Sequence, residues 1–117
     1  MRVKEALGTA AIEAVTGYLQ GCGFTILDRC WTCPAGEIAV VAADQRTLVA
    51  CEVRVRAGSR HRTPPDAVSA DRKQQLRAAA VSWLAAHGMR YDKIRVDVVA
   101  LLQESGGFTI EHVREVA

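Results

Sequence analysis

The apolar residues of this chain recur with two spacings, one typical of helices and one typical of strands. Over residues 4–22, and again from about residue 66 or 69 to residue 87, they return every three or four positions. That spacing predicts helices that each bury one stripe. Five shorter runs are rich in Val, Ile and other residues that favour strands. The predicted strands span residues 24–31, 37–42, 48–56, 94–102 and 108–113.

The predicted elements follow one another in the order α-β-β-β-α-β-β. A short loop at residues 44–46 joins the second and third strands, which predicts an antiparallel hairpin at the centre of the sheet. The order therefore favours an α/β fold in which a mixed sheet is flanked by helices. No repeat or low-complexity linker interrupts it, so we expect residues 1–117 to form a single domain.

Composition predicts a mainly aliphatic core, because half of the residues are hydrophobic but only 5% are aromatic. No stretch approaches the roughly 18 uninterrupted apolar residues of a membrane span. The charged start, residues 1–5, lacks the apolar stretch of a signal peptide. We therefore expect a cytoplasmic protein that does not bind membranes and whose four cysteines are reduced.

The third predicted strand carries charged residues on one face only. Side chains alternate across a strand, so Cys51 and Val53 face the core. Glu52, Arg54 and Arg56 then share the opposite face. One acidic and two guanidinium side chains are therefore expected near one end of the sheet.

On the second predicted strand, Glu37 and Ala39 share one face with Val41. If the hairpin pairs through residues 44–46, the first two positions lie near Glu52 and Arg54 at the same end of the sheet. A surface ion pair between a Glu and an Arg is an equally good explanation of the pattern. Such pairs typically contribute about 0–1 kcal/mol.

The charge of the chain is concentrated in one segment. The net charge is only +2, yet residues 54–77 contain seven basic side chains against Asp66 and Asp71. The basic residues are Arg54, Arg56, Arg60, Arg62, Arg72, Lys73 and Arg77. Guanidinium groups pair well with phosphate, and no aromatic residue interleaves with them to stack on bases. The segment predicts contact with a nucleic-acid backbone, the alternative being a merely solvated loop.

Two segments of the central hairpin, Gly36–Val41 and Val49–Arg56, resemble the signature of the YraN-type family of uncharacterised proteins. That family is similar to the PD-(D/E)xK nucleases, which include restriction-endonuclease-like and Holliday-junction-resolvase-like enzymes. Residues 67–77, with Lys73 taken as the family lysine, and the strand Arg95–Val99 continue the resemblance in order. It implies a restriction-endonuclease-like three-layer fold. It also implies phosphodiester cleavage assisted by Mg²⁺ or Mn²⁺, held by an Asp and a Glu with a Lys two residues further on.

This chain departs from the family pattern at the residues that carry the chemistry. The family Asp falls on Ala39, which has no ligand atom, and the family Lys falls on Arg54, which cannot act as a base. A Glu common on the first helix falls on Ile12, with Glu13 beside it. The resemblance thus implies a degenerate catalytic site.

The residues that remain define three functional hypotheses. Glu52, Arg54 and Glu37 are the candidate catalytic residues, and Glu52 and Glu37 the candidate metal ligands. The leading hypothesis is a domain that binds nucleic acid, DNA rather than RNA, without cutting it. The alternatives are a Mg²⁺- or Mn²⁺-dependent endonuclease that acts through Glu52, and a protein-interaction module. A homodimer would suit a nuclease-like fold.

Two further features leave their roles open. Cys30 and Cys33 form a CxxC pair, which occurs in zinc sites and in redox sites. Small, partly buried thiols are the simpler interpretation. Asp97 alternates with Val96 and Val98 in a buried-looking strand, where we expect it to pair with an arginine on another strand or to serve a structural role.

Overall fold

The computed structural model describes residues 8–57 and 68–114, which form two helices and five strands. The elements are α2 (Thr9–Gly21), β1 (Thr25–Cys33), β2 (Gly36–Asp44), β3 (Thr47–Ala57), α3 (Ala70–His87), β4 (Lys93–Glu104) and β5 (Gly107–Val113). The predicted order and α/β class are confirmed. α2 begins at Thr9, and residues 4–7 of the predicted helix lie outside the described part of the chain. β1 is longer than predicted and contains both cysteines of the CxxC pair.

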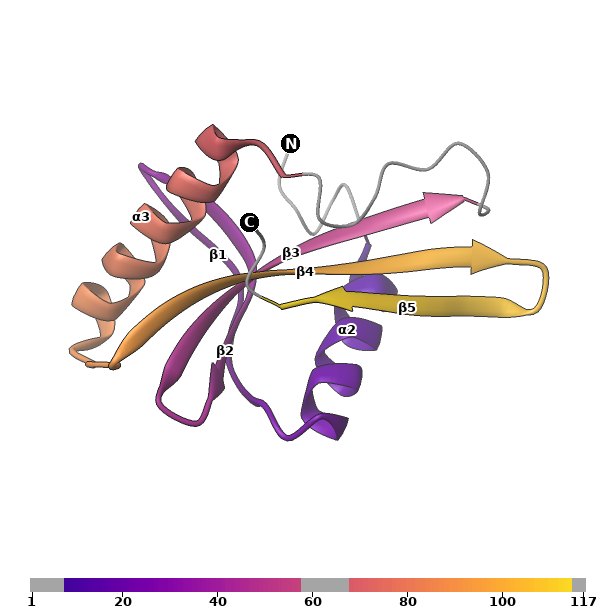
Figure 1. Cartoon of the computed structure of the whole chain (residues 1–117), viewed down its shortest axis with the longest axis horizontal. Helices are drawn as coiled ribbons and strands as arrows, with labels where there is room; N and C mark the ends of the chain where they lie inside the picture. Colours follow the sequence, from indigo (N-terminus) through magenta and orange to yellow (C-terminus); the bar gives the residue numbers. More distant parts are fainter. Residues whose placement is uncertain (1–7, 58–67, 115–117) are drawn as a thin grey trace.

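The five strands lie side by side in sequence order in one mixed sheet. β3 and β4 are parallel, with α3 between them in the chain, and the other neighbours are antiparallel. Figure 1 shows α2 and α3 on opposite sides of the sheet. The molecule therefore has three layers, with one apolar core under each helix.

The core under α3 is built on Leu76 and Trp83, which are almost fully buried. The indole Nε1 of Trp83 donates to Asp28 Oδ2 at 2.9 Å and so connects α3 to β1. Ser69 caps the start of the helix, where its Oγ accepts a hydrogen bond from a backbone N–H of the first turn. Gly88 caps the end of the helix in the left-handed conformation with φ 61°.

The core under α2 contains the predicted apolar face of β3. Val49 and Cys51 are fully buried there with Val15 and Leu19 of the helix. Cys22, the last residue of the predicted helix, is exposed. α2 ends at Gly21 and Cys22 is its C-cap, so the helical spacing does not extend to this position.

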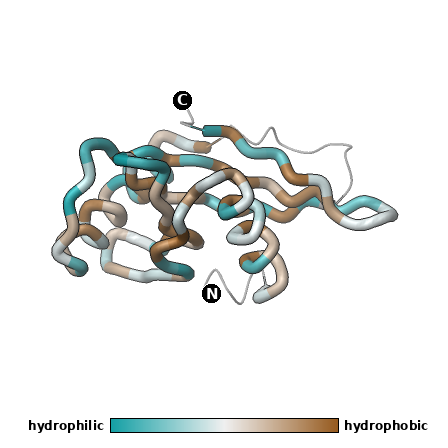
Figure 2. The backbone as a smooth tube through the Cα atoms, turned by 90° about the horizontal axis from the view of Figure 1, so that it is seen from below, coloured by the Kyte–Doolittle hydropathy of each residue, from teal (hydrophilic) through white to brown (hydrophobic). Residues whose placement is uncertain are grey.

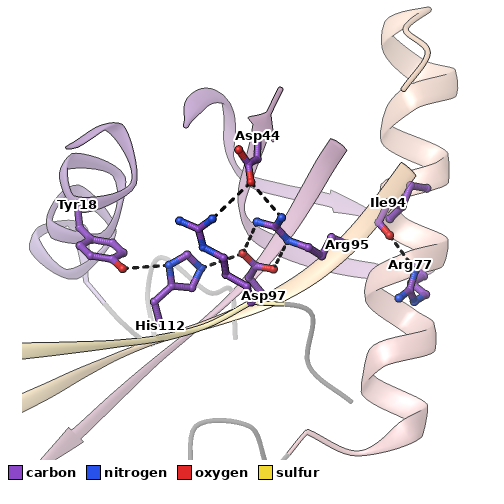
Figure 3. Close-up of polar contacts among 8 residues, drawn as sticks. Tyr18, Asp44, Arg77, Ile94, Arg95, Asp97 and His112 are labelled. Carbon is purple, nitrogen blue, oxygen red and sulfur yellow. Dashed lines mark hydrogen bonds and ion pairs between the residues drawn. The ribbon is translucent and has the colours of Figure 1, made fainter. Parts of the chain in front are cut away.

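A buried polar network joins α2 to the sheet (Figure 3). Asp97 is completely buried, and Arg95 donates to its two carboxylate oxygens from Nε at 2.8 Å and Nη2 at 3.0 Å. His112 Nε2 lies 2.8 Å from Asp97 Oδ2, and its Nδ1 lies 3.0 Å from the Tyr18 hydroxyl. Arg95 Nη1 also donates to Asp44 Oδ2 at 3.0 Å. The arginine partner of Asp97 is thus on the same strand, two residues away, and not on another strand as predicted.

The ends of β3, β4 and β5 extend beyond the helices in Figure 1. Figure 2 colours the turn between β4 and β5 from teal to white, without a hydrophobic residue, which fits its place at the far end of this extension. In the residues that the structure describes, no helix is long and apolar enough to cross a membrane.

We expect Asp97→Ala to destabilise the protein by about 3–5 kcal/mol, because the buried guanidinium of Arg95 loses its main carboxylate. Urea unfolding followed by circular dichroism measures the loss. Asp92→Ala is the control, since Asp92 pairs only at 3.5 Å with the exposed Arg46. Its loss should cost less than about 1 kcal/mol. Equal destabilisation by the two substitutions would contradict a structural role of the network.

Candidate nucleic-acid interface

β2 and β3 separate halfway along the central hairpin. Their pairing runs from the two-residue turn to Val40 opposite Cys51 and stops there, whereas β3 continues beside β4 to Ala57. At the same point the alternation of β2 breaks, because Ala39 and Val40 both pack in the core under α2. The predicted sharing of one face by positions 37, 39 and 41 is therefore wrong for Val41, which packs under α3.

Glu52 lies just beyond the point of separation, on the face of β3 that α3 covers. Arg72, in the first turn of α3, donates to both of its carboxylate oxygens, from Nε at 3.2 Å and Nη2 at 3.1 Å. The same guanidinium donates to the backbone oxygen of Glu37 at 3.2 Å and to Gln75 Oε1 at 3.2 Å. Both side chains of the ion pair are largely buried. A bidentate arginine pair of this kind is strong and directional.

The other acidic positions of the degenerate site do not gather around Glu52. Ala39 is 1% exposed and belongs to the core under α2. Glu37 alternates with Ile38, which packs under α3, so the Glu37 side chain leaves the strand on the α2 side. Glu13 is exposed on α2 and lines a separate hollow of about 430 Å³ between that helix and β1.

A divalent metal does not fit this arrangement. Mg²⁺ needs several hard oxygen ligands around one point, and both oxygens of Glu52 already accept from Arg72. Across residues 8–57 and 68–114, no group of three or more His, Cys, Asp or Glu side chains could hold a metal ion. The guanidinium of Arg72 therefore takes the place that a cation would occupy on Glu52.

The predicted nucleic-acid-binding residues fall into two places. Arg54 and Arg56 follow Glu52 on the same face of β3, and Lys73 is the neighbour of Arg72 at the start of α3. Arg77 lies elsewhere, with Nη1 donating at 3.0 Å to the backbone oxygen of Ile94 near the start of β4 (Figure 3). Arg60 and Arg62 lie outside the described residues.

Sequence reasoning missed that Arg72 is the partner of Glu52. The signal was available in the helix period, because Arg72 precedes the buried Leu76 by four residues and so shares its face. A basic residue on the apolar stripe of a helix is directed at the sheet. Grouping Arg72 with the solvent-facing charges overlooked its place on the buried face of α3.

The four cysteines are all free thiols in different surroundings. Cys30 packs in the core under α2 and Cys33 in the core under α3, so the CxxC pair is split between opposite faces of β1. This placement favours separate, partly buried thiols over a zinc or redox pair. Burial, with the nearby Asp97 carboxylate, raises the pKa of the Cys51 thiol far above its usual range.

Comparison with known sequences identifies the relatives of this chain. The sequence pattern of "Uncharacterised protein family UPF0102" matches residues 13–101. A UPF0102 protein of Acidothermus cellulolyticus is 40% identical, with 95% of this chain and 92% of that protein covered. UPF0102 proteins of Beutenbergia cavernae and an Arthrobacter species are 37% and 39% identical, with 99% of both chains covered in each case. The chain belongs to this family, which confirms the YraN-type resemblance.

We expect the Ala39→Asp variant to bind Mn²⁺ with a Kd no lower than about 1 mM. If the site had lost only this Asp, the substitution would instead restore tight metal binding. The reason is that Arg72 still holds Glu52 and that position 39 packs towards α2. Isothermal titration with Mn²⁺ measures the affinity, with the wild-type protein as the control. Tight metal binding by the variant would contradict the assignment of Arg72 as the built-in counter-ion.

Titration of the native protein with a thiol reagent should modify the exposed Cys22 first and leave Cys51 unmodified until the protein unfolds. The protected thiol should react at the rate of global or local opening, which urea increases. Cys22→Ser is the matched control and should remove the fast phase alone. Rapid modification of Cys51 in the folded protein would show that its core is open.

Proposed function

We propose that this member of the UPF0102 family binds nucleic acid, DNA rather than RNA, without cutting it. The observation that carries the proposal is the bidentate pairing of Arg72 with Glu52. It neutralises the one carboxylate that the nuclease pattern retains, and the basic side chains of Arg54 and Arg56 follow Glu52 on the same face of β3. The site is then suited to hold a phosphate group and poorly suited to hold a metal ion.

The positions of the cations support contact with the nucleic-acid backbone. Arg54 and Arg56 are two residues apart on one face of β3, about 6.6 Å along the strand, and both are half-buried. Lys73 adds a third cation at the start of α3. Arg72 neutralises Glu52, and the acidic residue nearest to Lys73 along α3 is Asp71 in the same turn. The first turn of an 18-residue helix also favours an anion electrostatically.

The absence of cutting follows from the chemistry of the side chains. Position 39 offers no ligand oxygen, and the guanidinium of Arg54 cannot take a proton from water at any working pH. Hydrolysis of a phosphodiester would therefore lack both a metal-activated water and a general base. The remaining Glu52 acts through Arg72 as a support for the phosphate-binding surface.

The test measures binding and cleavage of single-stranded, duplex and four-way DNA, and of duplex RNA, in the presence of Mn²⁺. We expect uncut complexes whose log affinity falls with log salt with a slope near −3 on duplex DNA, for about three phosphate contacts. Arg54→Ala with Arg56→Ala should reduce that slope by about 2. Arg29→Ala is the matched control, since Arg29 is exposed and lines the hollow beside Glu13 on the α2 side of the sheet, the face opposite Glu52.

Each other outcome identifies a different function. Cleavage that disappears in Glu52→Ala would replace the proposal with a metal-dependent endonuclease. Absence of binding to every nucleic acid at low salt would overturn it and leave a protein-interaction module. Tighter binding to duplex RNA than to DNA would correct the preferred ligand.

A further inference from the structure

A second cationic surface lies at the end of the sheet opposite Glu52. Three open hollows of about 600, 420 and 240 Å³ adjoin there, because neighbouring hollows share lining residues. They surround the β2–β3 turn and the segment that leads from α3 into β4, and we call this surface the turn end. The cationic side chains that line it are Arg46, Arg77, Arg90, Lys93, Arg95 and Arg114.

Few acidic groups offset these cations. Asp44 and Asp92 are the carboxylates among the lining residues. Asp44 already accepts from Arg95 and lies 3.7 Å from Arg114 Nη1. Arg95 is also matched by the buried Asp97 directly behind it. The turn end therefore keeps a larger excess of positive charge than the described residues around Glu52, where Asp71 adds to Glu52.

The lining chemistry indicates a phosphate-bearing ligand. Ile94 and Tyr91 are the largest apolar contributors, so the hollows offer little surface to a peptide or a lipid chain. Arg77 is held in place by its bond to the Ile94 oxygen, and Arg46 is highly exposed on the turn. Arginine forks of this kind match the paired oxygens of a phosphodiester.

The outer ends of the two cationic surfaces are far apart. Thr47, which lines the turn end, and Arg56, beyond Glu52, are nine residues apart on β3. At about 3.3 Å per residue their separation is roughly 30 Å. A phosphate at Arg54 and Arg56 is therefore well outside the hydrogen-bonding range of Arg46 and Lys93. Lys73 and Arg77, which are one turn apart on α3, lie between these two ends.

We infer that the turn end is a second phosphate-binding surface, which takes a second segment of nucleic acid so that one molecule bridges two. This inference rests on the proposed function, since the first segment is held beside Glu52. The partner is the same class of ligand at both ends, a phosphodiester backbone. Recognition at the turn end is electrostatic and independent of sequence.

The experiment uses two short DNA duplexes, one labelled with a fluorescence donor and one with an acceptor. A bridged complex produces energy transfer, and sedimentation confirms that it contains one protein chain. We compare the wild type with a turn-end variant, Arg46→Ala/Arg90→Ala/Lys93→Ala, and with Arg54→Ala/Arg56→Ala. Lys93→Glu serves as a single, milder substitution at the turn end, and Arg29→Ala is the control.

We expect the wild type to bind two duplexes and to give energy transfer. The turn-end variant and Lys93→Glu should lose the transfer and still bind one duplex, held by the surface beside Glu52. The Arg54→Ala/Arg56→Ala variant should likewise bind one duplex. The control should behave as the wild type does.

The remaining outcomes separate the two proposals. Wild-type binding of one duplex without transfer, unaffected by the turn-end substitutions, overturns the second surface and leaves the proposed function standing. Binding that is lost only in the turn-end variant supports phosphate contact at the turn end and overturns the role of the surface beside Glu52. No binding by the wild type overturns both.

Discussion

A carboxylate that is completely buried must be matched by donors, and this requirement organises the α2 side of the molecule. Asp97 meets it with Arg95 on its own strand and His112 on β5, and through them the network extends to β2 and α2. These partners come together in only one register of the strands. In that register Cys51 lies beside Asp97, and the next residue of β3, Glu52, faces the opposite side of the sheet.

The two faces of the sheet thus carry guanidinium–carboxylate pairs with different consequences. The pair of Arg95 and Asp97 is closed to solvent on the carboxylate side and holds elements together. The pair of Arg72 and Glu52 keeps 27% and 18% of its two side chains exposed. It joins α3 to β3 and still borders the surface. A carboxylate retained from a nuclease pattern can therefore serve as an anchor for a cation.

The same geometry explains why the positions of the nuclease pattern do not gather around Glu52 in this chain. The break in β2 at Ala39 and Val40 turns the position of the family Asp towards α2. Restoring an Asp at position 39 would leave both carboxylate oxygens of Glu52 bonded to Arg72. What remains accessible is positive charge, placed at both ends of β3, which is the property that a backbone-binding protein uses.

The sequence by itself determined the type and order of the helices and strands, and the faces of β3 that carry Cys51 and Glu52. These follow from spacing and intrinsic preference, which are local. The helix period indicates that Arg72 faces the sheet, but tertiary structure alone decided that its partner there is Glu52. Tertiary structure also decided that His112 meets Asp97 and that the basic segment divides between two ends of the sheet. Such contacts depend on where helices cross the sheet and where strands part, and no local spacing encodes those positions.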